Sequence, residues 1–229
     1  MKLFLVRHGD PNYADDCLTP LGHLQARAAA ERLAGEGIEK IYSSSCGRAV
    51  ETAEYTARAL GIPEVEQLDF MREISWGARY GEELYSHGHP WDVSDKMAAE
   101  NRDFMDPDWR DGEYFANNYI MDHYDSMIPC IDALLAGLGV VREGLYYRVK
   151  NCPYTAVALF SHGGSSSVLL SRVFNLPLPF VTSAICPECT AITVVTFAEG
   201  KETTVAPRFE IMNDARHIRG ISEKNVFGR

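Results

Sequence analysis

The stretch Leu3-Phe4-Leu5-Val6-Arg7-His8-Gly9 begins with four apolar residues and ends in a charged pair followed by glycine. Such a run is typical of a buried β-strand that delivers its last side chains to the rim of a pocket. A second apolar run, residues 155–160, ends in Ser161-His162-Gly163-Gly164. The chain therefore has two strand-like segments that each end in His-Gly. These two segments are the starting point for predicting both the fold and the functional site.

Strand-like and helix-like pieces alternate along the rest of the chain. A helix is expected to start at Thr19-Pro20, where threonine caps the helix and proline suits its first turn. We also expect helices over 47–60, 118–138 and 165–174, and strands over 2–6, 38–42 and 155–160. Residues 190–198 are β-prone and are expected to form a strand. The chain is expected to reverse at Gly200 and to continue as a second strand at about 203–212. This order predicts an α/β three-layer sandwich: a mostly parallel sheet with a C-terminal antiparallel hairpin and helices on both faces.

Composition limits the class of protein. A chain of 229 residues with 46% hydrophobic and 24% charged residues fits one soluble globular domain, 1–229. The net charge of -10 argues against a broad nucleic-acid surface. We expect a cytoplasmic protein with no membrane partner, because no targeting signal or membrane-spanning run is visible. The oligomeric state stays open, a homo-oligomer included.

The cysteines are expected to be reduced thiols, as is usual in the cytosol. Cys186 and Cys189 have a C-x-x-C spacing. A zinc site would need two further ligands at suitable spacing, and no paired motif appears. Cysteines at the edge of a strand are therefore the favoured interpretation.

Residues 79–118 differ in composition from the rest of the chain. They are rich in aromatic residues, acids and prolines, and they show no sustained period. We expect a lid-like insertion that covers the pocket and sets its specificity. His87 and His89 lie within it and are interpreted as exposed polar residues, with a role in the pocket as the alternative.

The two His-Gly motifs are expected to share one pocket, because ligands of open α/β sheets sit at the carboxyl ends of the strands. His8, Arg7 and His162 would meet there. The helix after Gly163 would aim its free amides at the same place, which favours an anion. Arg48 is the best second arginine, since a cation in the first turn of a helix is better explained if it meets an anion. The set is suited to phosphate.

Four motifs follow one another in chain order: Arg7-His8-Gly9, Ser44-x-x-x-Arg48-Ala49-x-x-Thr52-Ala53, Arg72-Glu73-Ile74-x-x-Gly77 and Ser161-His162-Gly163-Gly164. Together they resemble the histidine phosphatase superfamily, also called phosphoglycerate mutase-like. Asn213-Asp214-x-x-His217-Ile218 is similar to a further element of that family. The resemblance spans nearly the whole chain and implies the phosphoglycerate mutase-like fold.

The resemblance also implies roles for residues. His8 would be the nucleophile that forms a phosphohistidine, and Glu73 would be the general acid and base. Arg7, Arg48 and His162 would bind the phosphoryl oxygens and stabilise their charge. No metal or other cofactor is implied, because the arginines supply the positive charge. Asn12 and Gly163 are expected to contact the substrate, although Asp10-Pro11-Asn12-Tyr13 departs from the family's usual polar pattern.

Alternatives stay open for individual residues. Arg48 could be an exposed helix residue, and Glu73 could pair with Arg72 instead of acting as an acid. Glu51, Glu82 and Glu83 are other carboxylates in the same part of the sequence.

Three functions are weighed. The favoured one is hydrolysis of small phosphomonoesters through a phosphohistidine on His8. The second is a phosphoglycerate mutase, although the family's longer acid motif and extra arginines are not evident in Ser75-Trp76-Gly77-Ala78-Arg79-Tyr80-Gly81. The third is a non-catalytic phosphoester-binding protein, which loss of His8 or His162 would favour. Both histidines are present.

Overall fold

A six-stranded sheet forms the centre of the computed structural model, which describes residues 1–200 and 203–222. Its strand order is β10-β9-β1-β8-β4-β5. Strands β1, β8, β4 and β5 run parallel, β9 is antiparallel to β1, and β10 is antiparallel to β9. The predicted mostly parallel sheet with a C-terminal hairpin is confirmed. The strands are β1 Lys2–Arg7, β4 Lys40–Ser44, β5 Val65–Leu68, β8 Ala156–Ser161, β9 Ile192–Thr196 and β10 Arg208–Asp214.

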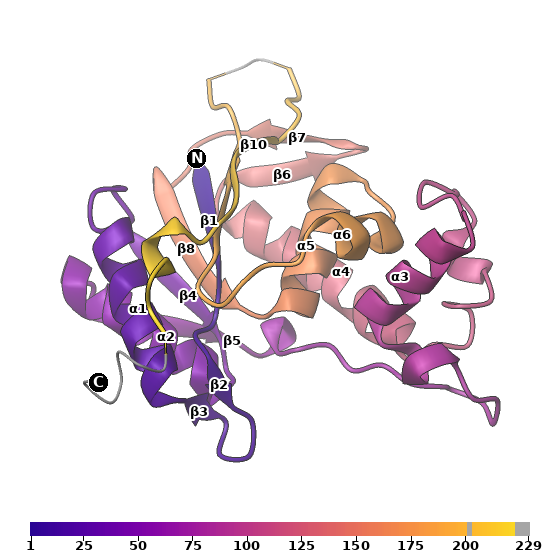
Figure 1. The fold of residues 1–229 in the computed structure, drawn as a ribbon. Coiled ribbons are helices and arrows are strands. Elements are labelled where there is room, and N and C mark those ends of the chain that lie inside the picture. The colour runs from indigo at the N-terminus through magenta and orange to yellow at the C-terminus, as the bar shows by residue number, and fades with distance from the viewer. Residues whose placement is uncertain (201–202, 223–229) are drawn as a thin grey trace.

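Helices cover both faces of this sheet, as predicted (Figure 1). In that view α1 (Pro20–Leu33) and α2 (Gly47–Leu60) lie on the left. Helices α4 (Ile120–Gly137), α5 (Gly163–Phe174) and α6 (Leu178–Ala184) lie on the right. The sheet therefore lies between two helical layers, and each layer builds its own hydrophobic core.

The four central residues of β1, Leu3 to Val6, are all apolar because the strand packs against both cores. Phe4 and Val6 belong to the cluster that includes Leu33 of α1. Leu3 and Leu5 belong to the cluster on the opposite face, which includes Val168 of α5. Alternate side chains of a strand point to opposite faces, so a strand covered on both sides needs a continuous apolar run.

Local signals place the helices around the site. Thr19 caps α1 by accepting a hydrogen bond from the Gly22 amide at 3.1 Å, and Pro20 occupies the first turn. Helix α2 ends at Gly61, whose φ of 67° is a left-handed conformation that glycine adopts without strain. Helix α4 continues through Pro129. The predicted helix boundaries agree with the structure to within two residues in these cases.

The segment between Gly77 and Tyr119 is closed at its base. The Arg79 amide donates to the Asn117 carbonyl at 2.8 Å, and the Tyr119 amide donates to the Gly77 carbonyl at 2.7 Å. The buried Asn118 side chain donates to the Gly88 carbonyl at 2.9 Å. Within this segment lie η2 (Tyr85–Gly88), α3 (Pro90–Ala99) and η3 (Trp109–Asp111), and Figure 1 shows α3 at the outer right beside α6.

Several elements depart from the sequence-based expectation. The last strand begins at Arg208 rather than at 203, and residues 201–202 lie outside the described part. Strand β5 and helix α6 were not predicted. No helix in the described part of the chain has the length and apolarity to cross a membrane. The remaining short elements are β2 Pro11–Asn12, β3 Cys17–Leu18, η1 Asp69–Met71, β6 Val140–Glu143, β7 Tyr146–Val149 and η4 Arg216–Ile218.

Candidate active site

Parallel pairing of β1 with β8 brings the two His-Gly motifs together. Arg7 lies in register with Ser161, and the His8 amide donates to the Ser161 carbonyl at 2.9 Å. The rings of His8 and His162 are 5.1 Å apart between centroids and inclined by 60°. The two histidines are only 2% and 0% exposed. They therefore form one buried pair at the carboxyl edge of the sheet.

His8 is held in a state suited to a nucleophile. Its Nδ1 lies 2.7 Å from the Gly9 carbonyl oxygen, an atom that can only accept. Nδ1 must then carry the proton, which leaves Nε2 with a bare lone pair. Burial lowers the His8 pKa to about 4, and the charges of Arg7 and Arg48 act in the same direction. The ring is therefore neutral at physiological pH.

His162 is anchored from the neighbouring strand. Its Nε2 lies 2.8 Å from Ser44 Oγ, and that same Oγ accepts from the Cys46 amide at 3.2 Å. The Ser44 hydroxyl can donate its proton to Nε2, and in that tautomer the ring proton of His162 lies on Nδ1. Nδ1 is buried and has no hydrogen-bond partner among the described residues. Burial lowers the His162 pKa to about 2, so this ring is neutral at physiological pH.

Arg7 and Arg48 each leave a buried donor unused. Arg7 Nη1 donates to the Pro187 carbonyl at 2.6 Å, which fixes the side chain, while its Nε has no hydrogen-bond partner in the described part of the chain. Arg48 is 8% exposed, and its Nε is also buried without a partner among these residues. An unsatisfied buried donor is costly, so these atoms are explained if an anion completes them. Arg48 is not an exposed helix residue.

Asp16 is a neighbour of Arg48 that the sequence did not reveal. Its carboxylate pairs with Arg48 Nη1 and also accepts from the Gly47 amide at 2.8 Å, at the start of α2. Tyr13, from the same hairpin, places its ring 5.3 Å from the Arg48 guanidinium carbon. Asp16 has a φ of 50°, a turn conformation that carries no signature in the sequence pattern. An anion bound by Arg48 would share the guanidinium with this carboxylate.

Glu73 approaches the start of α5 rather than pairing with Arg72. Its Oε1 accepts from the Ile74 amide at 3.0 Å and from the Ser165 amide at 3.2 Å. Burial raises the Glu73 pKa, which these two hydrogen bonds and the charges of Arg7 and Arg48 partly oppose. A carboxyl group with a raised pKa can hold a proton for transfer to a leaving group. Arg72 instead reaches Ser45 Oγ at 3.4 Å.

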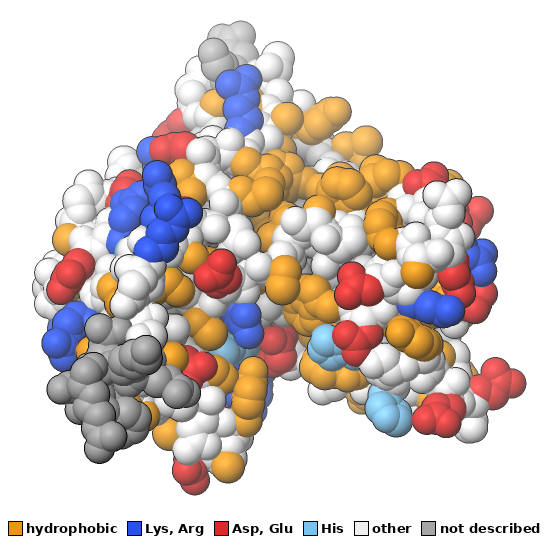
Figure 2. Space-filling model, in the orientation of Figure 1, with side chains coloured by type: hydrophobic (Ala, Val, Ile, Leu, Met, Phe, Trp, Pro, Cys, Tyr) orange, Lys and Arg blue, Asp and Glu red, His pale blue; other side chains and the backbone are white. Residues whose placement is uncertain are grey.

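A cavity of about 580 Å³ opens beside these groups, and Arg7, Glu73 and Gly163 line it. Figure 2 shows a hollow between the two halves of the molecule, with basic, acidic and histidine side chains on its walls. His8 and His162 adjoin Arg7 and Gly163 in the chain. A larger cavity of about 680 Å³ lies elsewhere, along β10 and η4, and contains none of the predicted site residues.

Two predictions about side chains differ from the structure. Asn12 stays within its own loop: its Nδ2 donates to Asp15 at 2.8 Å and its Oδ1 accepts from the Ala14 amide at 3.1 Å. It does not line the cavity. His89 does line the cavity, whereas His87 is exposed as expected. The expectation that His89 is an exposed polar residue is wrong, because α3 begins directly after it and faces the cavity.

The described residues contain no group of side chains that could hold a metal ion. Across 1–200 and 203–222, no three His, Cys, Asp or Glu side chains are placed to hold one ion. Cys186 and Cys189 are free thiols in the loop between α6 and β9, and Cys186 lines the cavity.

Gly164 permits the close approach of Glu73. A Cβ at this position would lie 2.3 Å from Ile74 Cγ1 and 2.6 Å from Glu73 Oε1. We expect Gly164→Ala to displace the carboxylate and lower kcat by about 100-fold, as misplacement by about 1 Å can do. Steady-state kinetics and thermal unfolding measure the change. Gly137→Ala is the matched control, since nothing lies within 4 Å of its Cβ; equal loss in both variants would contradict the prediction.

The fold and the site define a class: an α/β protein that gathers two neutral histidines and two arginines at the carboxyl edge of a parallel sheet. Residues 3–118 match the profile of the histidine phosphatase superfamily (branch 1). A probable phosphoglycerate mutase of Proteus mirabilis is 35% identical over 186 residues, which cover 77% of this chain and 76% of that protein. The chain belongs to the histidine phosphatase superfamily.

Other relatives carry different names. A putative phosphoserine phosphatase of Hydrogenobacter thermophilus is 35% identical over 94 residues, covering 37% of this chain and 46% of that one. Among solved structures, the Entamoeba histolytica phosphoserine phosphatase with 3-phosphoglyceric acid has a TM-score of 0.61 at 23% identity, covering 95% and 98% of the two chains. The structure of a mycobacterial glucosyl-3-phosphoglycerate phosphatase also has a TM-score of 0.61, at 23% sequence identity. The match covers 93% of this chain and 98% of that chain. These structures share the fold.

Proposed function

We propose that the protein is a phosphatase that hydrolyses small phosphomonoesters through a phosphohistidine on His8. The observation that carries the proposal is the hydrogen bond from His8 Nδ1 to the Gly9 carbonyl, which leaves Nε2 unprotonated. The same site holds buried nitrogens of Arg7, Arg48 and His162 that have no partner among the described residues. A lone pair in a site with unused donors suits attack on phosphorus with stabilisation of the equatorial oxygens.

The reaction has two steps in this proposal. His8 Nε2 forms a bond to phosphorus as the ester P–O bond breaks, and Glu73 gives its proton to the leaving oxygen. Glu73 then takes a proton from water, whose oxygen attacks the phosphohistidine and breaks the P–N bond. Inorganic phosphate leaves, and both side chains return to their starting states. Arg7 and Arg48 supply the positive charge, so the scheme calls for no metal.

The side chains that line the cavity favour hydrolysis over mutase chemistry, because few of them are basic. A phosphoglycerate mutase must hold the substrate carboxylate as well as its phosphate. Among the described residues that line the cavity, Arg7 is the one lysine or arginine, and we assign it to the phosphate. A substrate carboxylate would instead meet Glu73 and Asp95. The relatives include a probable phosphoglycerate mutase and a putative phosphoserine phosphatase. We therefore choose between the two reactions on the charges of the side chains that line the cavity.

The segment 79–118 has a defined part in the proposal. Through His89, Trp91 and Asp95 it supplies one wall of the cavity. We propose that it is a lid-like insertion within a single domain of residues 1–229, and that it selects the alcohol part of the substrate. The substrate is a freely diffusing small phosphoester, and the proposed location is the cytoplasm.

A product assay tests the proposal. The protein is incubated with n-propyl phosphate, p-nitrophenyl phosphate and 3-phosphoglycerate in the presence of EDTA, and products are followed by ³¹P NMR. We expect inorganic phosphate from the alkyl and aryl esters, undiminished by the chelator. Conversion of 3-phosphoglycerate to an isomer without free phosphate would establish the mutase instead. Binding of all three esters without turnover would favour a non-catalytic protein.

A further inference from the structure

The cavity has an aromatic wall that the phosphoryl chemistry does not use. It consists of Trp76, His89 and Trp91, all of which line the cavity. The His89 ring lies 4.8 Å from Trp76 in an edge-on arrangement and 5.5 Å from Trp91, measured between centroids. Trp91 also packs against Gly163, where an added Cβ would lie 3.1 Å from its ring. The wall therefore reaches from the lid-like insertion to the start of α5.

A carboxylate without a partner lies beside this wall. Asp95 lines the same cavity, and in the described part of the chain it forms no ion pair and accepts no hydrogen bond. Neighbouring carboxylates differ: Asp92 is bonded to Ser86 and lies 3.3 Å from His89 Nδ1. Asp95, which is exposed to solvent, thus adds a negative charge to a cavity whose basic side chain, Arg7, donates to the Pro187 carbonyl.

Hydroxyl donors at this end of the cavity are already occupied. Ser183 Oγ donates to the Phe180 carbonyl at 2.9 Å, and Thr182 Oγ1 is bonded to Ser94 at 2.6 Å. Trp91 Nε1 is a buried donor without a hydrogen-bond partner among the described residues, so the free donors left for a sugar or polyol here are few. A second anion would meet Asp95 and the negative faces of the aromatic rings. A cation satisfies both features, because ring faces and a carboxylate each attract positive charge.

We infer that the preferred substrates are phosphomonoesters of alcohols that carry an ammonium group, with the phosphate on the arginines and the ammonium between the aromatic wall and Asp95. The inference rests on the proposed function and adds the substrate class. The two ends of such a molecule have opposite charges, and the lining of the cavity holds both a basic residue, Arg7, and the acidic residue Asp95. Aromatic rings and a carboxylate recognise both primary and quaternary ammonium groups.

Four esters test the inference: 2-aminoethyl phosphate, n-propyl phosphate with an uncharged chain, and carboxymethyl phosphate, which are closely similar in size, and the larger choline phosphate. Hydrolysis is measured at a pH of about 8, where a free imidazole is neutral. We expect kcat/KM to be about tenfold higher for the two cationic esters than for n-propyl phosphate, and lowest for the carboxylate. Equal rates for the four esters, or a preference for the carboxylate, would overturn the inference while leaving the phosphatase in place.

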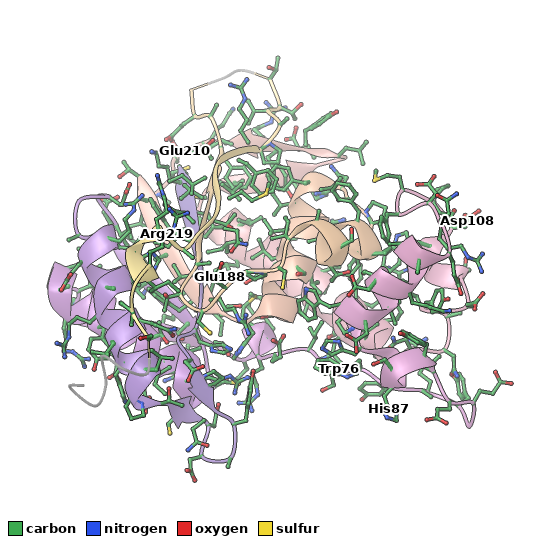
Figure 3. The ribbon with its side chains drawn as sticks, viewed as in Figure 1. Trp76, His87, Asp108, Glu188, Glu210 and Arg219 are labelled. Carbon is green, nitrogen blue, oxygen red and sulfur yellow. The ribbon has the colours of Figure 1, made fainter. Side chains whose placement is uncertain are left out.

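Variants test which residues cause the preference for cationic esters. Asp95→Asn and Trp76→Leu are expected to reduce the ratio of kcat/KM for the cationic ester to kcat/KM for the uncharged ester toward one. Asp108→Asn is the matched control, because Asp108 is exposed, does not line the cavity and is labelled at the right-hand edge of the molecule, apart from Trp76 (Figure 3). A ratio that stays unchanged in Asp95→Asn would contradict the assignment of that carboxylate.

A binding measurement separates the inference from the proposed function. In the His8→Ala variant, calorimetry compares 2-aminoethyl phosphate with n-propyl phosphate in the absence of turnover. About tenfold tighter binding of the cationic ester supports the inference even if no ester is hydrolysed. Equal affinities for the two esters would overturn it, whatever the catalytic result.

Discussion

Replacing His8 with alanine is expected to lower kcat/KM for every phosphomonoester by at least about 10⁴-fold, as removal of a catalytic nucleophile does elsewhere. The reason is that Nε2 of this neutral ring is the atom proposed to form the bond to phosphorus, and its Nδ1 is committed to the Gly9 carbonyl. Release of inorganic phosphate measures the loss. Binding of inorganic phosphate should persist, since Arg7, Arg48 and His162 remain.

The control for this variant is His87→Ala. His87 belongs to the same residue type but is exposed and lies on the outer side of the insertion (Figure 3). It should retain full activity. Phosphate binding by the His8 variant shows that the protein is folded. If His8→Ala retains more than a tenth of the wild-type rate while binding phosphate, another group is the nucleophile.

The second large effect is expected from Glu73→Gln. For alkyl phosphates the first step should slow by about 10²- to 10⁴-fold, because an alkoxide needs a proton as it leaves. For p-nitrophenyl phosphate the pre-steady-state burst should be nearly preserved, since nitrophenolate leaves without a proton. Later turnovers should be slow, because no base then activates water. Glu64→Gln, on an exposed loop, is the control. An equal loss of the first step for both leaving groups would contradict the acid role.

The pH dependence of Glu73 follows from the direction of its pKa shift. Burial raises this pKa, so the proton needed in the first step is kept to a higher pH and lost as the pH rises through the raised value. The alkaline limb of kcat/KM for alkyl phosphates should therefore disappear in Glu73→Gln. His8, with a pKa of about 4, contributes no acid limb near 6.5.

The sequence predicted the central part of the fold because strands buried on both faces are unmistakably apolar. Strand β5 was missed because it is an edge strand with two exposed residues, and Val-Glu-Gln-Leu has no clear pattern. Helix α6 was missed because Pro177 and Pro179 flank its start. The hairpin of β6 and β7 lies outside the main sheet, and exposed Leu145 and Tyr146 obscure its alternation.

For the site, the sequence indicated residues that follow strands and open helices, since topology brings these together. It did not indicate Asp16, and it gave a pocket role for His89 only as the alternative, because the places of both residues depend on how loops turn. Asn12 shows the opposite case: its side chain closes its own turn and is not among the residues that line the cavity, so its contact with the substrate stays a prediction. A polar residue in a loop has local backbone partners within reach. Sequence position alone does not show whether its side chain bonds to them or to a ligand.

The central claim is that His8 carries the phosphoryl group during turnover, and trapping that intermediate tests it most directly. The Glu73→Gln variant, which should hydrolyse the intermediate slowly, is mixed with p-nitrophenyl phosphate, quenched in alkali and analysed by peptide mass spectrometry. We predict one phosphoryl group on the peptide that contains His8, formed at the rate of the burst. A phosphoryl group on any other residue, or a burst with no phosphorylated peptide, would contradict the account.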